Sequence, residues 1–227
     1  MPVRAGAASR WTPAWFPVVG ALVGALAGGV RYGLDPLLGP VPASVLAAAT
    51  LVVCTGALHQ DGLADLADGL GVRGDRARRL AVMRDPRIGT FGVLAVALWL
   101  LALVSALSGL GREDALTALV VACALGRWSA LLHAVLAPPA RTDGLGAAFA
   151  VEPGPLAVAS TIAVGVALAL ESPAPAGSSL AAALAVTGAL NAAVHRLLGG
   201  RTGDTLGACI ALAEVTVSFV LLGWARH

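Results

Sequence analysis

The stretch His59-Gln60-Asp61-Gly62-Leu63-Ala64-Asp65-Leu66-Ala67-Asp68-Gly69-Leu70 places three carboxylates at steps of four and three residues, between two apolar segments. On a helix with about 100° per residue, Asp65 lies about 40° from Asp61, and Asp68 lies about 20° to the other side. Like charges in one narrow wedge repel unless a cation neutralises them. Because carboxylate oxygens suit Mg²⁺, the pattern predicts a metal site at Asp61, Asp65 and Asp68. A solvated acidic face is the alternative, and the flanking membrane-length apolar segments disfavour it.

The composition is that of a membrane protein. Of the 227 residues, 58% are hydrophobic and only 12% are charged, whereas soluble domains carry about 25% charged residues. The formal net charge of +2 is too small to indicate a nucleic-acid partner. Each of the three cysteines lies inside an apolar run without a CxxC motif, so we interpret them as packing residues.

Apolar runs of about 17–23 residues recur along the chain, the length that a bilayer requires. They predict an all-α, polytopic integral membrane helical bundle of about seven transmembrane helices, forming one domain over residues 1–227. The first, second and fifth runs are the shortest, so a re-entrant or interfacial assignment stays open for one of them. The first run also carries a GxxxGxxxG ridge, which predicts close approach of another helix. The runs are 18–34, 42–58, 91–111, 115–137, 155–171, 179–198 and 206–224, and the ridge is Gly20, Gly24 and Gly28.

The arginines predict the orientation, because positively charged loops stay on the cytoplasmic side. With seven spans, eleven arginines fall on the side of the N-terminus and of loops 59–90, 138–154 and 199–205, and three fall on the other. We therefore expect a multi-pass protein of the cytoplasmic (inner) membrane with its N-terminus inside and these three loops forming one cytoplasmic face. The eleven are Arg4, Arg10, Arg73, Arg76, Arg78, Arg79, Arg84, Arg87, Arg141, Arg196 and Arg201, and the three are Arg31, Arg112 and Arg226.

Two of the loops carry phosphate-binding patterns. Arg84 and Arg87 flank an aspartate just before a membrane span and are suited to bidentate phosphate contacts, although a positive-inside anchor explains arginines there as well. In the third loop, a glycine-rich turn leads into a helix whose first N–H groups form a natural phosphate site. Asp204 at that start is predicted either to ligate a cation or to cap the helix.

Ionisable residues inside the spans should face the bundle interior in pairs, since a lone charge in the bilayer is costly. Arg127 and Glu214 lie at similar distances from the same membrane face and are the predicted ion pair. For His133 and His195, a hydrogen-bonded structural role is the default and substrate contact is the alternative.

The acidic stretch resembles the HxDGLADxxDGL signature of the cobalamin synthase family, adenosylcobinamide-GDP ribazoletransferase. Met83 to Gly92 is similar to that family's segment M-basic-D-x-R-I-G-x-F/Y-G. Arg127-Trp128, Arg141-x-x-Gly144-Leu145-Gly146 and Gly199-Gly200-x-Thr202-Gly203-Asp204-Thr205-Leu206-Gly207-Ala208 match its later segments in order. The departures are Gln60, Leu66 and Ala211, which stand where the family usually has Leu, a small residue and Glu.

The resemblance implies a Mg²⁺-dependent membrane phosphotransferase that joins adenosylcobinamide-GDP to α-ribazole, or to its 5′-phosphate, and releases GMP. Asp61, Asp65 and Asp68 would hold Mg²⁺ and act in catalysis, with Asp68 one candidate for the base. Arg84, Arg87, Arg141, Asp204 and His59 would bind substrate. The expected partners are these two substrates and the lipid bilayer, and a homo-oligomer stays open. The alternatives are a CDP-alcohol-type phosphotransferase acting on a lipid alcohol, and a cation-coupled transporter, which would place its acidic residues nearer the bilayer midplane.

Overall fold

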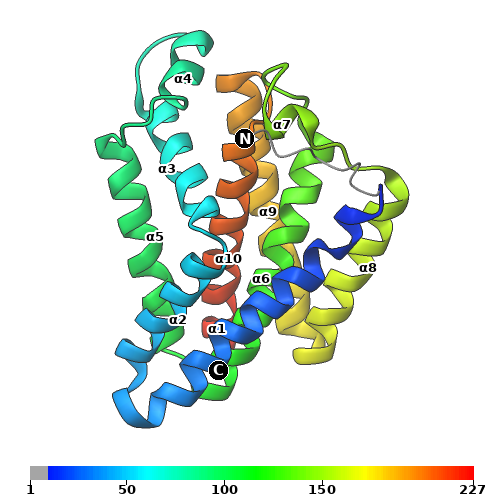
Figure 1. Ribbon diagram of the computed structural model, residues 1–227. Helices are drawn as coiled ribbons and strands as arrows, with labels where there is room; N and C mark the ends of the chain where they lie inside the picture. Colours follow the sequence, from blue (N-terminus) through cyan, green and yellow to red (C-terminus); the bar gives the residue numbers. More distant parts are fainter. Residues whose placement is uncertain (1–9) are drawn as a thin grey trace, which may run out of the picture.

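The protein is a bundle of long helices (Figure 1). The computed structural model describes residues 10–227, and Arg4 of the predicted cytoplasmic set lies outside that range. The short helices α4 and α7 lie at the upper end of the bundle, and the C-terminus lies toward the lower end. The elements are η1 (Thr12–Trp15), α1 (Phe16–Leu38), α2 (Pro40–Cys54), α3 (Leu58–Gly71), α4 (Arg76–Val82), α5 (Thr90–Ser108), α6 (Arg112–Leu136), α7 (Leu145–Ala148), α8 (Pro153–Leu170), α9 (Pro173–Leu198) and α10 (Gly203–Ala225).

Six helices in the described part of the chain are long and apolar enough to cross a membrane. The bent pair of α2 and α3 raises the number of spans to seven if the pair crosses as one unit. The predicted all-α, multi-pass membrane bundle is therefore confirmed. The exposed large hydrophobic side chains, such as Leu22, Leu98 and Leu101, fit a membrane environment, because contact with lipid removes the cost of exposing them to water.

The second predicted span is broken. Helix α2 has 15 residues, which is about 22 Å of helix and less than the hydrocarbon thickness of about 30 Å. The chain then turns through Gly56 and Ala57, both at a φ of 59°, and continues in α3 at 89° to α2. The acidic stretch is a helix, as its spacing predicted, but this helix lies within the bundle, so the predicted end loop does not begin at residue 59. Only the later part of 59–90, around α4, is an end loop.

The glycine ridge of α1 packs against α6, as the GxxxGxxxG pattern predicted. A Cβ atom on Gly20 would lie 2.3 Å from the carbonyl oxygen of Cys123, and one on Gly24 would lie 2.3 Å from that of Leu119. Any side chain at these two positions would force the helices apart. Helix α1, which crosses the bundle obliquely in Figure 1, therefore depends on these glycines for its contact with α6.

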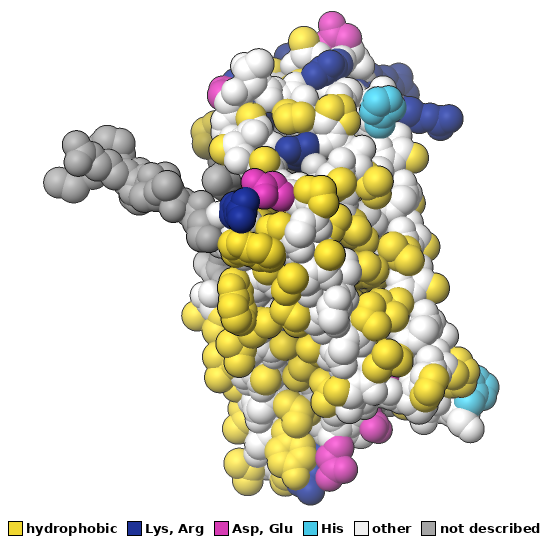
Figure 2. Space-filling view, turned by 90° about the vertical axis from the view of Figure 1, so that its right-hand side faces the viewer, with side chains coloured by type: hydrophobic (Ala, Val, Ile, Leu, Met, Phe, Trp, Pro, Cys, Tyr) yellow, Lys and Arg dark blue, Asp and Glu magenta, His cyan; other side chains and the backbone are white. Residues whose placement is uncertain are grey.

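The segment around α4 and the loops before α7 and before α10 meet at one end of the bundle. The guanidinium group of Arg76 donates to the carbonyl of Ala140 (2.7 Å), and Ala140 N–H donates to the carbonyl of Arg201 (2.8 Å). Figure 2 shows arginine side chains gathered mainly toward this upper end, above a broad band of apolar and neutral surface. At the other end, the Arg31 guanidinium contacts the carbonyl of Leu110 and Arg112 lies over the Tyr32 ring.

The buried ion pair between α6 and α10 is present. Arg127 Nη1 contacts Glu214 Oε1, and the two residues are only 5% and 2% exposed. The same nitrogen also donates to the carbonyl of Cys123 (3.3 Å). A charged side chain in the bilayer interior costs several kcal/mol unless it is paired, so this contact permits both residues to lie there.

We expect Arg127→Leu or Glu214→Leu alone to destabilise the detergent-solubilised protein by about 3–5 kcal/mol, because each leaves one buried charge without its partner. The double substitution should recover much of that loss. Thermal unfolding of the four proteins measures the coupling. A double variant whose loss equals the sum of the single losses would show that the pair contributes no interaction energy.

Candidate functional site

Helices α3 and α10 approach closely through glycines on each side. A Cβ atom on Gly62 would lie 2.6 Å from the carbonyl oxygen of Asp204, and one on Gly207 would lie 3.1 Å from that of Leu58. Gly62 directly follows Asp61 and precedes Asp65 by less than one turn. The contact therefore brings the acidic stretch next to the start of α10, so motifs about 140 residues apart in the chain form one site.

Four carboxylates and one guanidinium group interact at this junction. Asp65 experiences the charges of Asp204, Asp61 and Asp68, all of which oppose its own negative charge, and that of Arg141, which favours it. Asp65 and Asp204 are half-buried and Asp61 is exposed. The repulsion that the sequence predicted within the acidic stretch is therefore present, and Asp204 adds to it.

Asp68 has a different environment from the other two aspartates of α3. Its Oδ2 accepts the N–H of Gly89 (2.7 Å) and its Oδ1 accepts the N–H of Gly92 (2.9 Å), so it caps the start of α5. A Cβ atom on either glycine would lie within 2.5 Å of the Asp68 carboxylate oxygens. The glycines after Arg87 thus serve the contact with Asp68, which anchors α5 to α3.

The start of α10 is held by a network of side chains. Thr202 and Thr205 form a capping box, and the Thr202 hydroxyl also donates to Asp204 Oδ2 (3.1 Å). His133 of α6 contacts the Thr205 hydroxyl through Nε2 (2.9 Å) and Asn191 Oδ1 of α9 through Nδ1 (2.9 Å). His133 therefore has the predicted structural role, and three helices fix the position of Asp204.

The loops before α7 and before α10 are joined by main-chain and side-chain hydrogen bonds. Arg201 N–H donates to the carbonyl of Pro138 (2.8 Å), which forms a short parallel bridge at Pro139. The Arg201 guanidinium donates through Nη2 to the carbonyl of Phe149 (2.9 Å) and contacts that of Ala137 through Nη1. Arg201 was counted only for orientation in the sequence; the structure shows that it connects these loops.

Two hollows lie beside this junction. A partly open cavity of about 160 Å³ is lined by residues of segments 141–147 and 201–204. An open groove of about 840 Å³ adjoins it and shares Arg141, Asp143 and Ala147 with it. The groove is also lined by Arg76 and Arg84. A small charged cavity that opens into a larger groove can hold a compact polar group and the larger molecule that carries it.

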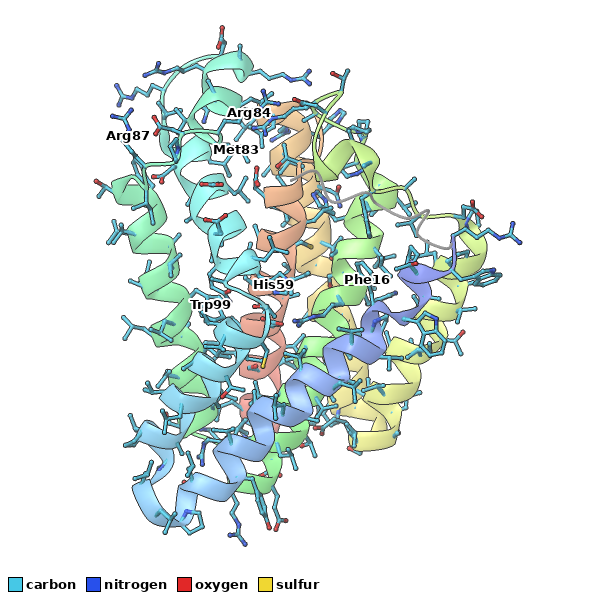
Figure 3. All side chains as sticks on the ribbon, viewed as in Figure 1. Phe16, His59, Met83, Arg84, Arg87 and Trp99 are labelled. Carbon is cyan, nitrogen blue, oxygen red and sulfur yellow. The ribbon has the colours of Figure 1, made fainter. Side chains whose placement is uncertain are left out.

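The predicted phosphate-binding arginines separate into two kinds. Arg84 lines the groove and forms an ion pair with Asp143 (2.6 Å), and Arg141 lines both hollows. Arg87 instead binds Asp85 through two side-chain contacts (2.9 and 2.7 Å) and lines neither hollow. In Figure 3, Arg87 lies at the outer edge of the upper end and Arg84 lies nearer α7.

His59 lies deeper than the other predicted substrate-binding residues. It is 9% exposed and lies about halfway down the bundle in Figure 3. Its backbone contributes to the close contact with Gly207. The structure brings together Asp61, Asp65, Arg84, Arg141 and Asp204. Asp68 lies near Asp65 but turns its carboxylate to α5, whereas His59 and Arg87 lie outside the group.

The carboxylates at the junction of α3 and α10 partly fit a Mg²⁺ site. Among residues 10–227, no three His, Cys, Asp or Glu side chains lie close enough together to ligate one metal ion. The predicted cage of three aspartates is therefore not preformed, because Asp68 turns toward α5. Mg²⁺ is more often held by one or two carboxylates together with water and substrate phosphates, and Asp65 with Asp61 or Asp204 supplies such carboxylates.

The fold and the site define a multi-pass helical membrane protein with a charged cavity at the end where its polar loops meet. A family model described as CobS, cobalamin-5-phosphate synthase, matches residues 1–222. The chain therefore belongs to the cobalamin-5-phosphate synthase family.

Curated relatives support this membership. A protein of Azorhizobium caulinodans is 41% identical over 193 residues, which cover 81% of this chain and 73% of the relative. One of Mesorhizobium japonicum is 43% identical over 186 residues, covering 79% and 70%, and one of Klebsiella pneumoniae is 40% identical over 192 residues, covering 83% and 78%. All three carry the name adenosylcobinamide-GDP ribazoletransferase. No solved structure gives a significant match.

We expect Thr205→Val to destabilise the protein by about 1–3 kcal/mol, because it leaves His133 Nε2 and the N–H of Thr202 without their hydroxyl partner. Thr205→Ser should retain most of the stability. Thr216→Val is the matched control, since the Thr216 hydroxyl contacts only the carbonyl of Leu212 in its own helix. Equal thermal unfolding temperatures for Thr205→Val and Thr216→Val would contradict a role of Thr205 in holding α10.

Proposed function

We propose that this chain is a Mg²⁺-dependent adenosylcobinamide-GDP ribazoletransferase that joins adenosylcobinamide-GDP to α-ribazole, or to its 5′-phosphate, with release of GMP. The observation that carries the proposal is the meeting of Asp61, Asp65, Asp204 and Arg141 beside a charged cavity and groove. Family membership and the names of the relatives support it.

The proposed reaction is a phosphoryl transfer. A ribose hydroxyl oxygen of the ribazole attacks the phosphorus next to the cobinamide, and the bond from that phosphorus to the bridging oxygen of GMP breaks. The hydroxyl proton leaves, and GMP departs with the bridging oxygen. Such a reaction requires alignment of nucleophile and leaving group and neutralisation of phosphate charge. Arg84 and Arg141, which line the groove, are placed to bind the phosphate oxygens.

Asp65 is the carboxylate best suited to accept the hydroxyl proton. It is half-buried next to Asp204 and Arg141, whereas both oxygens of Asp68 already accept N–H groups of α5. The sequence left the choice among the three aspartates open and offered Asp68 as one candidate. The geometry favours Asp65 as base and Asp68 as the residue that connects α3 to α5.

The metal would be held by Asp61, Asp65 or Asp204 together with the diphosphate. When bound, Mg²⁺ would neutralise phosphate charge and orient the leaving group. The bound cation would offset the repulsion between the carboxylates, which explains why several of them can lie close together. The absence of a preformed cage is compatible with a metal that arrives with the substrate.

We further propose a single integral domain in the inner membrane with its N-terminus inside and the cavity facing the cytoplasm. The gathering of arginines at the cavity end supports this orientation. The partners would be the corrinoid nucleotide, the ribazole and the bilayer, with no nucleic acid, and self-association stays open.

The catalytic proposal predicts that Asp65→Asn lowers the rate of GMP release by about 100-fold or more, because it removes the proposed base and one Mg²⁺ ligand. Chelation of divalent cations should abolish activity in the unmodified protein. Asp75→Asn is the matched control at the same end of the bundle, since Asp75 only caps α4 and Asn is an equally good cap. Activity that survives chelation would argue against the metal, and normal turnover by Asp65→Asn would argue against its role.

The orientation predicts the labelling of single cysteines in intact cells. After Cys54, which is exposed, is replaced by Ser, a cysteine at Ala77 on α4 should not react with a membrane-impermeant reagent. A cysteine at Ala174 in the first turn of α9, at the opposite end, should react. Cys123 and Cys209 are buried and should not interfere. The reverse labelling pattern would invert the proposed topology.

A further inference from the structure

The cavity beside α10 contains a buried positive charge without a counter-ion. Arg201 lines the cavity and is only 7% exposed. Its two terminal nitrogens contact main-chain carbonyls, and its Nε has no hydrogen-bond partner in the described part of the chain. No carboxylate among residues 10–227 lies within ion-pair distance of it. Carbonyl dipoles solvate a guanidinium group but do not neutralise it, so an anion would stabilise this residue.

The start of α10 adds a second, independent preference for an anion. This helix has 23 residues, and its first N–H groups have no acceptor within the helix. The Thr202 hydroxyl accepts the N–H of Thr205. The N–H groups of Gly203 and Asp204, the first two of the helix, belong to residues that line the cavity. A helix start of this kind is a common binding site for phosphate groups.

Arg141 completes the cationic wall. Burial, followed by the nearby charge of Arg84, lowers the pKa of Arg141, and burial lowers the pKa of Arg201. Asp204, Asp143 and Asp65 raise the pKa of Arg141 but do not fully offset its burial, and a bound anion would further stabilise both charges. Of the two carboxylates in the cavity wall, Asp143 is paired with Arg84, whereas Asp204 opposes an anion.

The size of the cavity limits what it can hold. Its volume of about 160 Å³ is that of about five water molecules and is well below the roughly 300–1,000 Å³ of pockets for drug-sized ligands. A single phosphate group has five heavy atoms and fits this volume. The adjoining groove of about 840 Å³ can hold the remainder of the molecule that carries it.

We propose that this cavity is a subsite for one terminal phosphate group, bound by Arg141, Arg201 and the first N–H groups of α10. The inference rests on the proposed function, which supplies two sources of such a group. One is the 5′-phosphate of a phosphorylated ribazole, and the other is the phosphate of the GMP unit. Both are phosphate monoesters in the free acceptor and in the free product, and the groove would take the attached nucleoside in either case.

Gly203 permits a test that removes a single N–H group. Proline is tolerated at the first position of a helix, and Thr202 before it has the extended backbone (φ −125°, ψ 177°) that proline requires. Gly203→Pro deletes the N–H, while the matched control Gly203→Ala keeps it. Arg141→Gln removes one cationic contact without relying on Gly203.

The experiment measures KM for α-ribazole and for α-ribazole 5′-phosphate, and product inhibition by GMP, in the detergent-solubilised full chain. Gly203→Pro and Arg141→Gln should weaken binding of the phosphate that occupies the cavity by about tenfold or more. Gly203→Ala should change it much less. A rise in KM confined to the phosphorylated ribazole would assign the cavity to the acceptor, and weaker inhibition confined to GMP would assign it to the guanosine side.

Unchanged KM values and unchanged GMP inhibition in both Gly203→Pro and Arg141→Gln would overturn the proposal. If Gly203→Ala is as impaired as Gly203→Pro, the result for Arg141→Gln decides. If the proposed function is wrong, the unmodified protein should release no GMP with either acceptor. In that case, calorimetric binding of GMP and of inorganic phosphate to the same variants still tests the subsite.

Discussion

The close approach of α3 to α10 is the contact on which the site depends. It is possible only because Gly62 and Gly207 have no side chains where the two backbones meet. Because α2 ends after 15 residues, the chain turns and α3 runs beside α10 for the rest of the crossing. The same geometry that completes a broken span thus brings the aspartates of α3 to Asp204 and Arg141.

Two buried polar contacts near this junction also order the site. The ion pair of Arg127 and Glu214 connects α6 to α10, and His133 connects the same two helices through the Thr205 hydroxyl. An unpaired polar group in the bilayer costs several kcal/mol, so the free energy of folding strongly favours these contacts. The contacts that pair polar groups in the bundle interior therefore also hold the start of α10 in place.

Much of this arrangement could be predicted from the sequence. Hydrophobic run length indicated the spans, glycine spacing indicated the contact of α1 with α6, and equal depth indicated the pair of Arg127 and Glu214. Helical periodicity placed Asp61, Asp65 and Asp68 on one side of a helix, but it could not show that Asp68 caps α5. That contact joins residues more than 20 positions apart, and only the tertiary fold determines it.

The individual contacts of the arginines are the feature that the sequence predicts least well. A positive-inside count treats the members of an end loop as equivalent, yet the structure assigns them different contacts. Arg79 donates to the carbonyls of Gly69 and Leu70 at the end of α3, and Arg76 holds the loop at Ala140. Arg87 is neutralised by Asp85, whose pKa it lowers to about 2.

An arginine that is already paired with a carboxylate contributes less to binding an anion than an arginine that contacts only main-chain carbonyl groups. On this criterion Arg87 is the weakest candidate for binding a phosphate. Arg84 is intermediate, because its pair with Asp143 is exposed and exchanges readily with solvent. Arg141 and Arg201 have main-chain acceptors and no carboxylate in direct contact within the described chain, so their charge stays available at the cavity. The position of an arginine in a loop therefore says less about its function than the type of acceptor it already has.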